Sequence, residues 1–347
     1  MRSSLLHRVV NAAAPIRICD NGGWTDTWFA GHGKIFTIAV SPCVEVQIEV
    51  FDRSSRPDRI VVHAENFGDR YVVDPDRTRP GAHPLLEAAI DEITIPDHLA
   101  VEITIHSAAP AGCSTGTSAA ATVALVGALD ALTPGRMTPL ELAATAHRIE
   151  IDRLGLQSGI QDQLSAAYGG INFIEMPAYP QATVHPVAVD DAVQWELESR
   201  VALIFLGRSH VSSAVHAQVI AEIEGESGRH RLDALRGTAE RSRDALMAGD
   251  FSAFGAAMID NTEAQAELHP DLVSADARAV IDVARSHGAV GWKVNGAGGE
   301  GGSLTILCGP SATQKRAMVA ALAQADPLFQ WIPTHLSRSG VRIWERD

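Results

Sequence analysis

Residues 110–121, PAGCSTGTSAAA, are the stretch of sequence that most directly decides the fold. The segment before it, LAVEITI at 99–105, has the alternating pattern of a strand, and the Ala-, Val- and Leu-rich segment 118–132 predicts a buried helix. Small residues between them let the backbone approach a ligand, and the first turn of the helix offers unpaired N–H groups to an anion. The stretch therefore indicates either a phosphate-binding loop or a capped loop that only feeds a core helix. It lacks the lysine of the G-x-x-x-x-G-K-[ST] motif.

The hydrophobic pattern around this loop changes from strand-rich to helix-rich. Before the loop we expect strands at 44–50, 59–63 and 70–73. After it, a helix at 139–154 has Thr138 as N-cap, Pro139 in its first position and Glu141 three residues after the cap. The remaining expected elements are helices at 161–168, 211–268 (with interruptions), 276–287 and 313–325, and strands at 201–206, 289–294, 304–308 and 341–344.

The chain is long enough for two domains. It has 347 residues, and single hydrophobic cores stop growing near this size. The best boundary is a proline-containing polar stretch between residues 179 and 198. We therefore expect an N-terminal domain of residues 1–190 and a C-terminal domain of residues 191–347.

The composition argues against several classes of partner. Lys and Arg number 28 and Asp and Glu 42, so the formal net charge is −14, with no basic cluster to attract nucleic acid or an anionic membrane. No apolar run reaches the ~18 residues of a membrane span, and the first fifteen residues lack a secretory pattern. Four scattered cysteines, without a C-x-x-C pair, favour free thiols. We expect a cytoplasmic protein that binds neither nucleic acid nor membrane, as a monomer or homodimer.

Three further segments could carry chemistry. GIQDQ at 159–163 places Asp162 at the start of an expected helix, where a carboxylate could act on a ligand or simply favour the helix dipole. KVNGAGGEGGS at 293–303 has too many glycines for a simple hairpin and would allow close backbone approach. PIRICDNGGWTD at 15–26 puts Arg17 and Asp26 on either side of a Gly-Gly turn.

Taken together, these segments resemble the motifs of the GHMP kinases, in that family's order. PIRICDNGGWTD looks like the first motif, PAGCSTGTSAA like the phosphate loop and KVNGAGGEGG like the third motif. GIQDQ is similar to the G-x-x-D-Q element of the sugar-kinase branch. Residues 149–175 and 195–207 resemble D-glycero-D-manno-heptose 7-phosphate 1-kinases, and GGWTDT at 22–27 resembles fucokinases.

The resemblance implies an α+β fold of two domains with the active site in the cleft between them. It also implies an ATP-dependent phosphotransferase that uses ATP and Mg²⁺ and accepts a small sugar or sugar phosphate. Asp162 would orient or deprotonate the attacking hydroxyl, Arg17 would stabilise charge beside it, and Ser118 and Glu150 would hold the metal ion. The residues implied for ATP are Pro110, Gly112, Cys113, Ser114, Thr115, Gly116, Thr117 and Ser118. Those implied for the acceptor are Gly23, Thr25, Asp26, Gly159, Gly296, Ala297 and Gly298.

The differences between this chain and the GHMP kinase motifs bear mainly on the identity of the acceptor. Asp20 and Trp24 in the first motif and Glu300 in the third differ from what close relatives carry, while Ser114 replaces a common glycine of the phosphate loop. The leading hypothesis is a kinase for the anomeric hydroxyl of a hexose or a heptose 7-phosphate. The alternatives are a kinase for a non-anomeric hydroxyl of a cyclitol or another polyol, a sensor that binds ATP and sugar without turnover, and the decarboxylase branch of the superfamily. The sugar-type GIQDQ element argues against that branch.

His210 and the thiol of Cys113 are further residues that could face ligands, although a surface histidine and a buried inert thiol explain them equally well.

Overall fold

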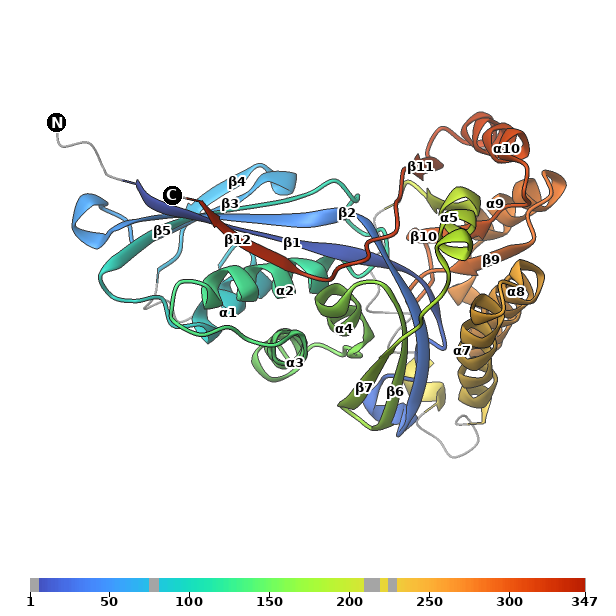
Figure 1. Cartoon of the computed structure of the whole chain (residues 1–347), viewed down its shortest axis with the longest axis horizontal. Helices are drawn as coiled ribbons and strands as arrows, with labels where there is room; N and C mark the ends of the chain where they lie inside the picture. Colours follow the sequence, from blue (N-terminus) through green and yellow to red (C-terminus); the bar gives the residue numbers. More distant parts are fainter. Residues whose placement is uncertain (1–5, 75–80, 209–218, 224–229, 347) are drawn as a thin grey trace.

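The structure, a computed structural model, describes residues 6–74, 81–208, 219–223 and 230–346. His210 and residues 211–218 of the expected helical tract lie outside the described residues. Two sheets, each covered by helices, form two adjoining lobes (Figure 1). The α+β fold in two lobes is confirmed.

The first sheet has eight strands and is built around two long antiparallel neighbours, β1 and β2. Register shifts interrupt β1 at Pro15/Ile16 and again between Ile18 and Asn21. Such shifts bend a strand and re-aim its side chains, and here they fall on both sides of Arg17. The strands in order are β12 (Arg342–Arg346), β1 (Leu6–Asn21), β2 (Gly33–Asp52), β5 (Leu99–Ser107), β3 (Ile60–Ala64) and β4 (Asp69–Val72), with β6 (Ile171–Ala178) on β2 and β7 (Gln181–Pro186) on β6.

One face of this sheet is covered by helices, with α2 (Thr117–Asp130) lying against β1 and β2 (Figure 1). Helix α2 is apolar on all sides and fully packed, as expected of a helix inside a core. The other helices of this lobe are α1 (Pro84–Glu92), α3 (Pro139–Arg148) and α4 (Gln161–Tyr168).

The second sheet is smaller and antiparallel. Its helices include α7 and α8, which pack against each other, and α8 lies against β9. The strand order is β11 (Gln330–Ile332), β8 (Val201–Phe205), β10 (Ser303–Leu307) and β9 (Gly291–Val294). The described helices are α5 (Asp191–Arg200), α7 (Arg231–Met247), α8 (Phe251–Leu268), α9 (Ala275–Ser286) and α10 (Ala312–Ala325).

The chain crosses between the lobes more than once. The position chosen for the domain boundary, residue 190, falls between β7 and α5, and β12 returns to pair with β1 in the first sheet. The division into residues 1–190 and 191–347 remains a prediction. None of the described helices is long and apolar enough to span a membrane.

One of the expected α-helices ends earlier than the sequence pattern indicated. The helix expected over 139–154 has its capping box at Thr138 and Glu141, but α3 stops at Arg148 and Ile149–Arg153 form a π-helical turn. Turns of this kind are common at functional sites, and this one carries Glu150.

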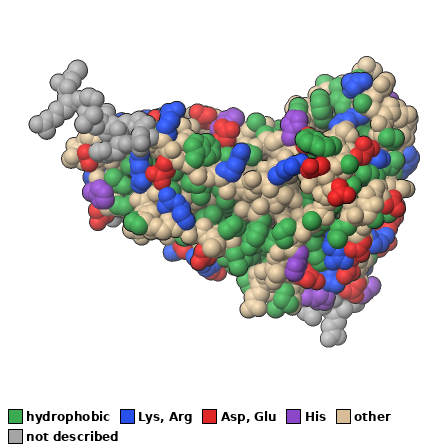
Figure 2. All heavy atoms as spheres, in the orientation of Figure 1, with side chains coloured by type: hydrophobic (Ala, Val, Ile, Leu, Met, Phe, Trp, Pro, Cys, Tyr) green, Lys and Arg blue, Asp and Glu red, His purple; other side chains and the backbone are tan. Residues whose placement is uncertain are grey.

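Charged side chains of both signs lie on the described part of the surface that Figure 2 draws. On the face drawn in Figure 2, Lys and Arg side chains are interspersed with Asp and Glu. All four cysteines are free.

Candidate active site

Two adjoining cavities lie where the first motif, the phosphate loop and the third motif converge. The larger has a volume of about 930 Å³ and the smaller about 140 Å³. The residues that line both are Arg17, Gln157, Ser158, Asp162, Gly296 and Ala297. A group transferred from a ligand in one cavity to a ligand in the other would therefore pass Arg17 and Asp162.

The expected phosphate loop forms one wall of the larger cavity. Residues 111–118 line it, and α2 begins at Thr117, so its first-turn N–H groups and positive dipole end serve this wall. Gly112, Ser114 and Gly116 have φ of 76°, 58° and 70°. Ser114 is thus a non-glycine residue in left-handed backbone, at a position where we expected a glycine. Pro110 does not line the cavity.

The far end of the larger cavity is apolar. Phe67, Leu85, Leu86 and Ile105 line it, a lining suited to the flat face of a nucleobase. Asn66 ties this end together, because its side chain donates to the carbonyl of Ser107 and accepts from its N–H, both at 2.7 Å. The larger cavity therefore offers an anion-binding end and an apolar end, as a nucleotide requires.

Arg17 and Asp162 form an ion pair at the junction of the two cavities. Arg17 Nε donates to Asp162 Oδ1 at 2.7 Å and Nη2 donates to Oδ2 at 3.3 Å, while Nη1 donates to the carbonyl of Ser114 at 2.6 Å. Burial works against the charged form of Arg17, but the carboxylates of Asp162 and Asp20 raise its pKa above the ordinary value. Asp162 also lies against the phosphate loop, since a Cβ at Gly116 would be 3.1 Å from its Cγ. The pair is thus held in one geometry by the loop that faces the nucleotide site.

Glu150 and Ser118 fit the requirements of a magnesium ion. Both line the larger cavity, and Mg²⁺ in kinases is typically held by one or two protein oxygens plus phosphates and water. Glu150 is buried and its Oε1 has no hydrogen-bond partner. Burial raises the pKa of Glu150 to about 7. An orphaned carboxylate oxygen beside a phosphate loop is the donor that such an ion would satisfy.

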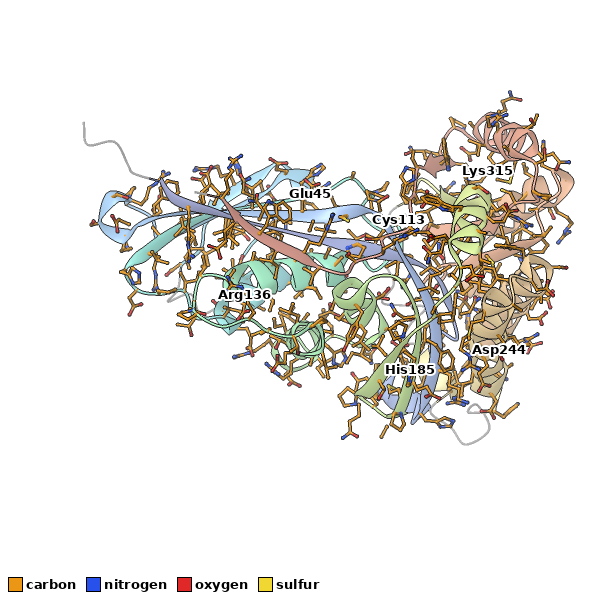
Figure 3. All side chains as sticks on the ribbon, viewed as in Figure 1. Glu45, Cys113, Arg136, His185, Asp244 and Lys315 are labelled. Carbon is orange, nitrogen blue, oxygen red and sulfur yellow. The ribbon has the colours of Figure 1, made fainter. Side chains whose placement is uncertain are left out.

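The third motif approaches the phosphate loop as its glycines suggested. A Cβ at Gly296 would be 2.9 Å from the carbonyl oxygen of Ser114, and one at Gly302 would be 2.8 Å from Ser114 Oγ. Ser303 Oγ donates to the carbonyl of Cys113 at 2.6 Å. Cys113 is buried where the two lobes meet (Figure 3), and burial raises the pKa of its thiol. The thiol is therefore held in its neutral form. Glu300, also in the third motif, is exposed and lines neither cavity.

A buried ion pair connects the first motif with the third. Lys293 Nζ lies 3.3 Å from Asp20 Oδ1, and both side chains are fully buried. Asp20 also accepts from the N–H of Gly296 at 3.0 and 3.1 Å and lies 3.8 Å from Arg17 Nη2. Lys293 further donates to Gln265 Oε1 at 3.1 Å and to the carbonyl of Val294. Asp20 thus supports both Arg17 and the third-motif backbone.

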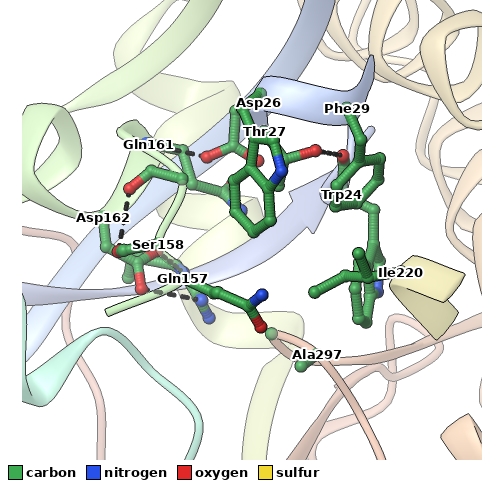
Figure 4. A pocket seen from close by; sticks show the side chains of 14 residues that line it. Trp24, Asp26, Thr27, Phe29, Gln157, Ser158, Gln161, Asp162, Ile220 and Ala297 are labelled. Atoms are coloured by element: carbon green, nitrogen blue, oxygen red, sulfur yellow. Dashed lines mark hydrogen bonds and ion pairs between the residues drawn. The ribbon is translucent and has the colours of Figure 1, made fainter. Parts of the chain in front are cut away.

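The smaller cavity has a polar side and an apolar side (Figure 4). Asp26, Gln161, Ser158 and Asp162 lie on one side, and Asp26 Oδ2 accepts from the N–H of Gln161 at 3.0 Å. Burial raises the pKa of Asp26 to about 6, and the charge of Asp162 adds to this rise. The apolar residues lining the cavity are Trp24, Trp28, Phe29, Ile220 and Ala297.

The structure does not bring every expected acceptor residue to the cavity wall. Gly159, Gly296 and Ala297 line it, as does Asp26, but Gly23, Thr25 and Gly298 do not. Thr25 is buried and holds the turn, because its hydroxyl donates to the carbonyl of Gly22 at 2.7 Å and accepts from Lys34 N at 3.1 Å. A Cβ at Gly298 would be 2.1 Å from the carbonyl oxygen of Leu272, so this glycine allows backbone packing.

Eight residues that line the smaller cavity were absent from the sequence-based set of site residues, namely Trp24, Thr27, Trp28, Phe29, Gln157, Ser158, Gln161 and Ile220. Trp28 and Phe29 come shortly after the first motif. Their position beside that motif was the signal in the sequence that could have identified them as site residues.

Comparison with known proteins agrees with this geometry. Residues 84–170, which include the phosphate loop and Asp162, match the GHMP kinases N terminal domain. Residues 84–170 are thereby identified as a GHMP kinase N-terminal domain. The resemblance inferred from the motifs is thereby confirmed, and with it an ATP-dependent phosphotransferase.

The names of the proteins that are similar to this chain specify kinases for different compounds. A D-glycero-alpha-D-manno-heptose 7-phosphate kinase from Campylobacter jejuni is 26% identical over 250 residues, covering 71% of each chain. A mevalonate kinase from Thermococcus gammatolerans is 26% identical, covering 71% of this chain and 69% of its own. The crystal structure of a D-glycero-D-manno-heptose 1-phosphate kinase from Bacteroides thetaiotaomicron superposes with a TM-score of 0.74, at 24% identity, over 96% of this chain and 98% of the other. Such low identity shows a shared fold and leaves the acceptor of this chain open.

Proposed function

We propose that this GHMP kinase transfers the γ-phosphate of ATP to a hydroxyl of a sugar or sugar phosphate, and that the hydroxyl is the anomeric one of a hexose or of a substrate like heptose 7-phosphate. The observation that carries the proposal is the Arg17–Asp162 pair at the junction of a nucleotide-sized cavity and a small polar cavity. The sugar-type GIQDQ element and the named heptose kinase relative support a sugar acceptor.

Each residue at the junction has a definite role in this proposal. The acceptor hydroxyl lies against Asp162, which accepts its hydrogen bond and orients an oxygen lone pair toward the γ-phosphate. Asp162 takes the proton as the new O–P bond forms and the bond between the γ-phosphorus and the β–γ bridging oxygen breaks, which releases ADP. Arg17 holds Asp162 in place through two hydrogen bonds and opposes the negative charge on the transferred group. The α2 N-terminus and the loop N–H groups hold the phosphates. Mg²⁺, held by Ser118 and Glu150, would neutralise charge on the β- and γ-phosphates.

The complete set of acidic and basic groups argues against a binding-only sensor. Arg17, Ser118, Glu150 and Asp162 all line the larger cavity, and a sensor would not need a carboxylate at the junction. Because phosphoryl transfer depends mainly on positioning and charge, a chain that retains these groups around one cavity is equipped for turnover.

A coupled ADP-release assay over a panel of sugars and cyclitols tests the proposal. Wild type is compared with Asp162→Ala, and ATP affinity is measured for both by calorimetry. We expect turnover on at least one acceptor, with kcat reduced at least ~10²-fold in Asp162→Ala while ATP still binds. Full activity of Asp162→Ala would contradict the role of Asp162, and ATP binding without turnover on the whole panel would favour the sensor.

A further inference from the structure

The smaller cavity carries more negative than positive charge. Asp26 and Asp162 both line it. Asp26 is only 2% exposed, and the effect of Asp162 on its pKa shows that the two carboxylates act on each other. A second anionic group on a ligand here would be repelled by both.

The one positive group in the described wall is already engaged. Arg17 is the sole Lys, Arg or His among the described residues that line this cavity, and it binds Asp162 and the Ser114 carbonyl. Two basic side chains near the segment that follows Phe29 are also paired, and one of them, Arg236, donates to the carbonyl of Ala30. Lys34 Nζ pairs with Glu240 at 2.6 Å, and Arg236 pairs with Asp233 at 2.6 Å. The described wall therefore presents no uncommitted cation to a phosphate or carboxylate on the acceptor.

The opposite side of the cavity is aromatic. Trp24 and Phe29 are 7% and 5% exposed, and their ring centroids lie 6.4 Å apart. Trp28 lies edge-on to Phe29 at 5.1 Å, and Ile220 completes this side (Figure 4). Aromatic rings of this kind pack against the C–H face of a ring polyol while carboxylates opposite accept hydrogen bonds from its hydroxyls.

We propose that the acceptor is a ring sugar without any anionic group, bound with its C–H face on the aromatic side and its hydroxyls toward Asp26 and Asp162. This inference rests on the proposed function, whose acceptor it narrows. It separates this chain from the two relatives described above, whose names specify anionic compounds, a sugar phosphate and a carboxylic acid. Of the two acceptors left open, it selects the free sugar over the heptose 7-phosphate.

Matched pairs of acceptors test the proposal. Mannose, galactose, glucose and D-glycero-D-manno-heptose are each compared with the phosphate ester at the terminal hydroxyl, with mevalonate and myo-inositol added, in the ADP-release assay. We expect kcat/KM for a free polyol to exceed that for its ester, and for mevalonate, at least ~10-fold. A preference for any ester or for mevalonate would overturn the proposal.

A charge change in the wall provides an internal control. Gln157 is exposed and lines both cavities, so Gln157→Lys adds a cation without disturbing the core, and Gln157→Met matches its length without charge. Gln157→Lys should reduce the preference for the free polyol at least ~3-fold, and Gln157→Met should not. An equal effect of both variants would contradict the electrostatic reasoning.

Direct binding separates this proposal from the kinase proposal. The same pairs are titrated by tryptophan fluorescence, which Trp24 and Trp28 should report. Selective binding of free polyols without turnover would refute the kinase activity and support the pocket chemistry. Equal or tighter binding of the esters, or no binding of any compound at millimolar concentration, would overturn the proposal that the acceptor carries no anionic group.

Discussion

Replacing Asp26 by asparagine should make the ligand-free protein more stable at neutral pH while removing its activity. Burial raises the pKa of Asp26 from 3.8 to about 6, so the folded state holds a proton that the unfolded chain has already lost. The stability of the wild type therefore falls as pH rises through this window. A shift of about 2 pKa units corresponds to about 3 kcal/mol. Asparagine cannot ionise, and its oxygen can still accept the hydrogen bond from Gln161 N.

Urea unfolding of the nucleotide-free protein between pH 4 and 8 measures this effect. The difference between Asp26→Asn and wild type should be near zero at pH 4 and grow to as much as about 3 kcal/mol in favour of the variant above pH 7. Asp58→Asn, which changes an exposed carboxylate, is the matched control and should show no such growth. If Asp26→Asn were less stable than wild type at pH 8, or if the difference did not change with pH, the buried-carboxylate reasoning would be refuted.

Three further predictions follow from contacts at the site. Gly159→Ala would place a Cβ 2.0 Å from Asp26 Oδ2 and should raise KM for the acceptor at least ~10-fold with ATP affinity unchanged by calorimetry; Gly237→Ala, with no heavy atom within 4 Å of the new Cβ, should change neither, and a parallel loss of ATP affinity in Gly159→Ala would count against two separate subsites. Lys293→Met removes the buried cation that lies 3.3 Å from Asp20, so it should lower the free energy of unfolding by roughly 3–5 kcal/mol. The double variant Asp20→Asn/Lys293→Met keeps an oxygen for the Gly296 N–H and should recover part of this loss in urea unfolding, and no recovery would mean that the ion pair is not the cause. Ser114→Gly relieves a φ of 58° and should raise the free energy of unfolding by about 0.5–1 kcal/mol, whereas Ser114→Ala should not; equal effects would point to the hydroxyl instead.

Local signals predicted helices α2, α3 and α4 of the first lobe and the phosphate loop well. The glycines after Tyr168 ended α4 where expected, and Thr138, Pro139 and Glu141 located the start of α3. The π-helical turn after Arg148 could not be predicted, because its hydrogen bonds depend on how the turn carrying Glu150 packs, not on helix-forming residues.

Elements that depend on distant partners were missed. Strand β1 contains the Ala-rich segment at 11–14 and Pro15, without polar alternation, and its extended form comes from pairing with β2 on one side and β12 on the other. The β6–β7 hairpin and helices α1 and α5 were not expected either. The link between Asp20 and Gly296 joins residues 276 positions apart, so Asp20 could be noted as unusual in the sequence but not given a partner.

The acceptor cavity shows the same limit. Asp26 and Gly159 were expected from motifs, whereas Trp28 and Phe29 line the cavity because the connection from β1 to β2 folds over it. The chemistry of transfer is thus encoded in short motifs, and the choice of acceptor in the way separate segments meet.

The most direct test of the central claim is ³¹P NMR of a reaction mixture containing this kinase, ATP, Mg²⁺ and the best free sugar of the panel. The account predicts that the γ-phosphate signal of ATP is replaced by ADP and a sugar phosphate ester, coupled to the anomeric proton, in equal amounts. Release of inorganic phosphate alone, or ATP that stays intact while it binds, would contradict the claim that Arg17 and Asp162 pass the phosphoryl group from one cavity to the other.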